Sequence, residues 1–63
     1  MNLDLAIIEL QRSRELHTYN APIHDLAGDK AQAKLCLQIA QQCNEAQHIL
    51  ESYIAYSSVF ENI

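Results

Sequence analysis

The sequence has very few residues that interrupt a helix. Its 63 residues include one glycine and one proline, and neither falls between Lys30 and Asn62. These two residue types are the strongest local signals for turns and helix ends. Their scarcity predicts one long helix over the second half of the chain.

Positive charge is also scarce. Four basic residues against eight acidic ones give a net charge of −4. Proteins that bind nucleic acid draw most of their affinity from Lys and Arg on phosphates, so four cations disfavour that class of partner. No apolar run approaches the roughly 20 residues that span a membrane, and the opening Met-Asn-Leu-Asp-Leu lacks the basic region of a secretory signal. We therefore expect a cytoplasmic protein without a membrane partner.

Residues that could carry chemistry are few and badly spaced. The three histidines and two cysteines form no Cys-x-x-Cys, His-x-x-x-His or Glu-x-x-His pattern, and there is no glycine-rich phosphate loop. A helical hairpin also has no cleft that could enclose a substrate. We expect no metal, no cofactor and no enzymatic activity. Cys36 and Cys43 lie about 10.5 Å apart along a helix axis, too far for an intrahelical disulfide. They are expected to be reduced, although an intersubunit disulfide stays open.

The first segment has helical spacing from about residue 3 to residue 19, with Asn2 as a suitable N-cap. Its apolar positions form two sets: Leu3, Ile7 and Leu10, and Leu5, Ile8, Leu16 and Tyr19. Asn20-Ala21-Pro22 is predicted to end the helix, because proline disfavours the α conformation of the residue before it. Residues 20–29 would then form a loop, with a short helical turn over 23–27 as one alternative. A continuous element with a weak joint at Gly28 is the alternative we favour.

The second segment, from about residue 30 to residue 61, is predicted to be one long amphipathic helix. The expected fold is a single all-α domain, a two-helix hairpin in which a first helix of about 25 Å covers half of a second helix of about 50 Å. The uncovered part is rich in apolar and aromatic residues. The apolar arc, predicted to form an oligomer interface, consists of Leu35, Ile39, Cys43, Ala46, Ile49, Leu50, Tyr53, Tyr56 and Phe60.

The core of a chain this short is marginal on its own, and such chains usually need disulfides, a metal, oligomerisation or very regular helix packing. We therefore expect a homo-oligomer, a dimer or a trimer. Lys30 and Lys34 near the start of the second helix, and Glu51 and Glu61 toward its end, all oppose the helix dipole. An antiparallel second copy would bring the two groups together, so the second copy is the expected cover for the apolar arc.

The polar side of the second helix is the candidate surface for a different protein. Its residues follow 3-4 spacing, and the connecting segment near His24 is the alternative location. The predicted partner surface is His24, Gln38, Gln41, Glu45 and His48. The partner would be a host or phage protein that the sequence does not identify.

The whole chain resembles the 63-residue open-reading-frame products of the exo–xis region of lambdoid bacteriophages, through its length, its opening MNLDLAIIELQRSRELH and its two-helix layout. The resemblance implies an early phage accessory protein in the cytoplasm of the infected bacterium. Such proteins modulate prophage induction and the choice between lysis and lysogeny. It also implies a two-helix oligomer, and it supplies no catalytic or binding residues.

Two other functional classes stay open at this point. Rop-type nucleic-acid-binding hairpins have a similar size and dimerise into four-helix bundles, but no sequence motif is shared with them. Arg12 and Arg14 are two residues apart and therefore diverge around a helix instead of forming a row. A purely structural oligomer without an external partner is the third class.

Overall fold

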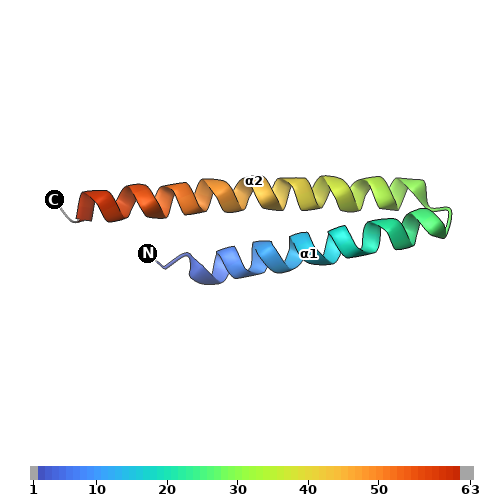
Figure 1. The fold of residues 1–63 in the computed structure, drawn as a ribbon, viewed down its shortest axis with the longest axis horizontal. Coiled ribbons are helices and arrows are strands. Elements are labelled where there is room, and N and C mark those ends of the chain that lie inside the picture. Colours follow the sequence, from blue (N-terminus) through green and yellow to red (C-terminus); the bar gives the residue numbers. More distant parts are fainter. Residues whose placement is uncertain (1, 62–63) are drawn as a thin grey trace.

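The computed structural model describes residues 2–61, and the side chains of residues 2–59. It contains two helices, α1 over Asp4–Leu26 and α2 over Lys30–Glu61, which lie side by side and antiparallel (Figure 1). The predicted all-helical hairpin is confirmed. The molecule measures 55 × 15 × 12 Å, and its radius of gyration is 15.4 Å, against about 10.6 Å for a compact domain of this length. Within the described residues, neither helix is long and apolar enough to cross a membrane.

The predicted end of the first helix at Tyr19 is wrong, because α1 continues through Pro22 to Leu26. Proline in a helix removes one backbone N–H and leaves the carbonyl four residues earlier without its donor. Here that carbonyl belongs to Thr18, and both Thr18 and Pro22 are exposed, so water can reach it. Ala21 beside the proline is only 3% exposed. Packing of this side of α1 against α2 outweighs the local preference.

Gly28 ends α1 and is not a weak joint inside one continuous helix. It has a φ of 85°, a left-handed conformation that glycine adopts without steric cost. The N–H of Gly28 donates to the Asp25 carbonyl at 3.1 Å, and the N–H of Asp29 donates to the His24 carbonyl at 2.9 Å. These two bonds form a Schellman motif, the common closure of a helix C-terminus.

The next helix starts immediately after this closure. Asp29 Oδ1 accepts a hydrogen bond from the backbone N–H of Gln32 at 3.1 Å, which makes Asp29 the N-cap of α2. At the other end of the hairpin, Asn2 Oδ1 accepts from the N–H of Asp4 at 2.9 Å. The connection is therefore the short segment 27–29, and the expected loop over 20–29 does not form.

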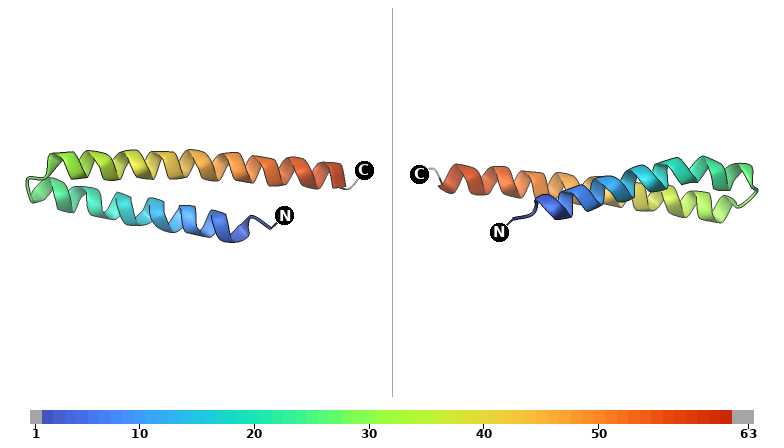
Figure 2. Two further views of the ribbon diagram at one scale, coloured as in Figure 1. Left: turned by 180° about the vertical axis from the view of Figure 1, so that it is seen from behind. Right: turned by 90° about the horizontal axis from the view of Figure 1, so that it is seen from below.

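Because α1 is longer than expected, it covers more than half of α2. At 1.5 Å per residue the two helices are about 35 and 48 Å long. Arg14 bonds to Asn44, and continuing this pairing toward the N-terminus places the start of α1 beside about residue 54 of α2. Only the last turns of α2 extend past the N-terminal end of α1 (Figures 1 and 2). The uncovered length of α2 is thus much shorter than the sequence suggested.

The closing motif predicts the effect of substituting Gly28. Nothing lies within 4 Å of the position that a Cβ would occupy there, so Gly28→Ala causes no steric clash with neighbouring atoms. Its only cost is the strain of placing alanine in the left-handed backbone conformation. The substitution should lower the free energy of unfolding by about 1 kcal/mol, measured by urea denaturation at fixed protein concentration. Gly28→Asn should cost less, because asparagine tolerates this conformation better. Equal stability of Gly28→Ala and the unaltered chain would contradict this helix closure.

Candidate interaction surfaces

The face of α2 that packs against α1 is made mostly of small and polar residues. Its positions alternate by three and four residues, the spacing of a coiled-coil seam. We call this set the α2 inner seam: Ala33, Cys36, Ala40, Cys43, Gln47, Leu50 and Ile54. The three most buried apolar members are Cys36, Ala33 and Ala40, at 6%, 7% and 8% exposure. Small side chains let two helices approach closely, but they bury little apolar area.

The facing side of α1 is apolar near the N-terminus and polar toward the turn. Ile7 and Leu10 are half-buried, and Arg14 and His17 follow at the next seam positions. Arg14 donates from a guanidinium nitrogen to Asn44 Oδ1 at 2.9 Å, which joins the two helices in the middle of the seam. The His17 Nδ1 lies 2.7 Å from the Ser13 carbonyl oxygen within α1. The interior of the hairpin therefore contains a polar layer in place of a large apolar core.

Gln47 is the most buried polar residue of this layer, at 8% exposure. Its Nε2 donates to Glu51 Oε1 at 2.7 Å. Its Oε1 is buried and accepts no hydrogen bond, and an unpaired buried acceptor costs about 1–3 kcal/mol. Rotating the amide by half a turn would bring its oxygen against the Glu51 carboxylate. The unpaired oxygen is therefore fixed by the neighbouring glutamate.

Large apolar side chains of α2 lie on a second face, about 100° round the helix from the inner seam. Leu35 is 46% exposed, and Ile49, Tyr53 and Tyr56 are between 53% and 68% exposed, while the smaller or flanking members are half-buried. We call this face the α2 stripe: Leu35, Ile39, Ala46, Ile49, Tyr53 and Tyr56. Among the other predicted interface residues, Cys43 and Leu50 belong to the inner seam, and the side chain of Phe60 lies outside the described residues.

The face of α1 turned away from α2 carries a second exposed apolar stripe. Its members alternate by three and four residues, with Arg12 filling one gap. We call it the α1 stripe: Leu5, Ile8, Leu16, Tyr19, Ile23 and Leu26. The sequence predicts its first four members but not its extension to Ile23 and Leu26, because the helix was expected to end at Tyr19. The same 3-4 spacing continues across Pro22, and this signal alone could have located the whole stripe.

The predicted partner surface divides in the structure. Gln38, Gln41, Glu45 and His48 are exposed along one side of α2, where Gln41 Nε2 donates to Glu45 Oε1 at 3.3 Å. His24 is half-buried in the last turn of α1, on the face that packs against α2. His24 therefore lies apart from the four α2 residues, because a helix that continues through Pro22 rotates it inward, and the role of these residues in binding a partner stays a prediction.

Most described cations already have partners within the chain. Arg12 bonds to Glu9 at 3.0 Å, Lys30 bonds to Asp25 at 2.7 Å, and Arg14 is turned toward Asn44. Glu51, expected to face lysines of a second copy, lies on the opposite side of α2 from the α2 stripe. The charge pairing between copies stays a prediction, and the positions of these groups do not favour it.

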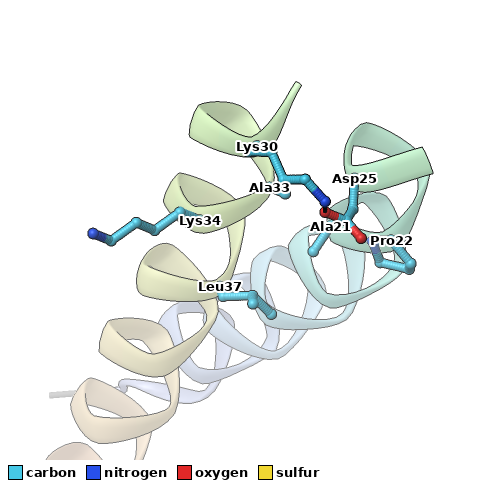
Figure 3. Close-up of a pocket in the computed structure, with 7 residues that line it drawn as sticks. All are labelled: Ala21, Pro22, Asp25, Lys30, Ala33, Lys34 and Leu37. Carbon is cyan, nitrogen blue, oxygen red and sulfur yellow. Dashed lines mark hydrogen bonds and ion pairs between the residues drawn. The ribbon is translucent and has the colours of Figure 1, made fainter. Parts of the chain in front are cut away.

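An open groove of about 450 Å³ lies at the closed end of the hairpin. Figure 3 shows its apolar residues from both helices, with the Lys30–Asp25 ion pair at one edge and the Lys34 side chain extending away from it. Its lining residues are Ala21, Pro22, Asp25, Lys30, Ala33, Lys34 and Leu37. Within the described residues no three metal-ligating side chains lie together. Cys36 and Cys43 are both free thiols.

Comparison of the chain with protein-family models, with curated proteins and with solved structures gives no match.

The unpaired oxygen of Gln47 predicts a stabilising substitution. Gln47→Met keeps the unbranched shape of the side chain and removes the buried acceptor, and it should raise the free energy of unfolding by about 1 kcal/mol. Gln41→Met is the matched control, because it also loses a hydrogen bond to a glutamate four residues later but lies on the exposed side. Urea denaturation of both variants tests this, and a lower stability for Gln47→Met than for Gln41→Met would show that the buried amide contributes net stability.

Proposed function

We propose that this chain is a non-enzymatic interaction protein that self-associates through the α2 stripe and modulates the development of a lambdoid phage. The observation that carries the proposal is the distribution of apolar side chains. The most buried apolar residues of the hairpin are alanines and one cysteine, while large apolar residues of both helices are exposed. A helix pair with this distribution gains more from covering its outer faces than from its own seam.

The surface area supports this interpretation. The single chain exposes 4964 Å², against about 4100 Å² for a compact monomer of the same mass. The excess comes from the elongated shape and from apolar side chains that no second element covers. In chains of this length another subunit is one of the usual ways to stabilise a small core.

The geometry of α2 suits a helical bundle. The inner seam packs against α1, and the α2 stripe lies about a quarter turn away, with the same 3-4 spacing. A helix in a bundle contacts two neighbours in this manner. We therefore assign the α2 stripe to association between copies, as a dimer or a trimer, and leave the exposed polar row Gln38–His48 available to a different protein.

The biological setting rests on the resemblance of the whole chain to exo–xis-region products of lambdoid phages. On this proposal the protein acts in the cytoplasm of the infected host and binds a host or phage protein. It influences prophage induction and the choice between lysis and lysogeny without catalysing a reaction.

The shortage of unengaged basic side chains argues against the nucleic-acid-binding alternative. Three of the four cations are engaged by groups of the same chain, which leaves Lys34 as the one described cation without a hydrogen bond or ion pair. Affinity for a phosphate backbone requires several such groups on one face. We therefore prefer a protein partner.

Self-association predicts that a charge placed in the α2 stripe separates the copies. Ile49→Glu would bury an unpaired carboxylate in the interface, at a cost of about 3–5 kcal/mol, and sedimentation equilibrium should show a mass reduced to that of one chain. His48→Glu introduces the same side chain at the adjacent exposed position and should leave the mass unchanged. If Ile49→Glu leaves the mass of the oligomer unchanged, the α2 stripe does not form the interface between copies.

The role in phage development predicts an effect on induction. Two lambdoid lysogens, one expressing the unaltered chain and one expressing Ile49→Glu, should differ in the timing or yield of prophage induction. The reason is that, on this proposal, the self-associated form is the active form of the protein. His48→Glu should self-associate like the unaltered chain. Any difference in induction between these two would then show that the polar row Gln38–His48 contributes to the function. Identical induction with the unaltered chain and with no chain at all would refute this role.

A further inference from the structure

The α1 stripe is a second interaction surface that association through the α2 stripe leaves open. The inner face of α1 is defined by the buried Ala21 and by the Arg14–Asn44 hydrogen bond. The α1 stripe lies about half a turn from both. A bundle built on the α2 stripe adds its subunits beside α2 and places α1 at the periphery, with this stripe facing outward.

The exposure of the stripe is high along its whole length. Ile8 is the least exposed member at 44%, and Leu26 is the most exposed at 89%. Its members occupy one face of α1 over five helical turns or more. Contiguous apolar surface of this extent on a small protein marks an interaction site.

The charged residues around the stripe are mainly acidic. The side of α1 turned away from α2 carries three carboxylates, from Asp4, Glu9 and Glu15, against the single guanidinium of Arg12. Arg12 bonds to Glu9, and Lys30 from α2 bonds to Asp25. Asp4 and Glu15 keep their carboxylates exposed and form no ion pair with another described residue. A surface with apolar residues along its centre and acids at its edges favours a partner with the opposite pattern of charge.

A second copy of this chain does not supply that pattern. The exposed row beside its α2 stripe consists of Lys34, Gln38, Gln41, Glu45 and His48, in which the single lysine is balanced by a carboxylate. Its arginines are engaged by Glu9 and Asn44. The complement of the α1 stripe must therefore come from another protein.

We propose that the α1 stripe binds a basic amphipathic helix of a different protein, with apolar residues at 3-4 spacing and Lys or Arg on either side of them. This inference rests on the proposed function, since it names the kind of partner that such an interaction protein would bind. The partner helix would pack along α1 as an added bundle helix, with its cations near Asp4 and Glu15.

Two synthetic helical peptides test the charge preference. Both carry leucines at the same 3-4 spacing, one with lysines beside them and the other with glutamates. Fluorescence anisotropy with the full chain should show at least tenfold tighter binding of the lysine peptide at low ionic strength. The difference should shrink in high salt, because exposed charges are screened. Equal affinity of the two peptides, or preference for the glutamate peptide, would overturn the proposal.

Matched variants test the location. Leu16→Ser should weaken binding of the lysine peptide about tenfold. Leu37→Ser should leave the affinity unchanged, because Leu37 has nearly the same exposure, 56% against 54%, but lies outside both stripes. Glu15→Lys should weaken binding several-fold, and Glu15→Gln, which removes the charge without reversing it, should weaken it less. Circular dichroism establishes that each variant is helical before binding is measured.

The remaining outcomes separate this inference from the proposed function. NMR amide shifts caused by the lysine peptide should map to α1, and shifts confined to the α2 stripe would overturn the inference. If Leu16→Ser instead lowers the mass of the oligomer, a second copy covers the α1 stripe and the inference is also wrong. Failure of the proposed self-association would show independently as an unchanged mass of Ile49→Glu in the absence of peptide.

Discussion

The close packing of two helices through small side chains is the constraint on which the rest of the molecule depends. Ala21 on α1 and Ala33, Cys36 and Ala40 on α2 allow the backbones to approach, and none of them contributes much apolar area. Near the turn, the larger apolar residues consequently lie on other faces of the helices. The exposed stripes and the elongated shape follow from a seam whose half nearest the turn is made of small side chains.

The polar residues of the seam give the hairpin specificity and contribute little to its stability. Arg14 can reach Asn44 only when the two helices are aligned in one register. Gln47 and Glu51 occupy the next turn of α2, with one amide oxygen left without a donor. Buried polar groups can exclude alternative pairings at the expense of stability. A hairpin held in this way has a defined alignment but a small thermodynamic margin.

Sequence reasoning located the helices better than their faces. The Gly28-Asp29 pair carries both the end of α1 and the cap of α2, and the long range without glycine or proline indicates α2 directly. The predicted helix end near Pro22 was wrong because it considered only the local effect of proline on a helix. The packing of Ala21 against α2, which depends on the tertiary structure, outweighs that effect. The interface prediction combined two neighbouring faces of α2 into one arc. The prediction therefore grouped Cys43 and Leu50 of the inner seam with residues of the α2 stripe. Hydrophobicity alone does not show which of two apolar faces an adjacent helix will cover.

The short turn at Gly28 has a consequence for the order in which the hairpin forms. Asp25 and Lys30 meet across a very small loop, so the entropy lost in bringing the closed ends together is small. Each later contact between the two helices then adds only one further helical turn on each side. These contacts proceed from Ala21 and Ala33 to Arg14 and Asn44. Contacts that are local in sequence favour rapid folding. The hairpin should therefore close from the turn outward, and Ile7 and Leu10 should dock last and fray first.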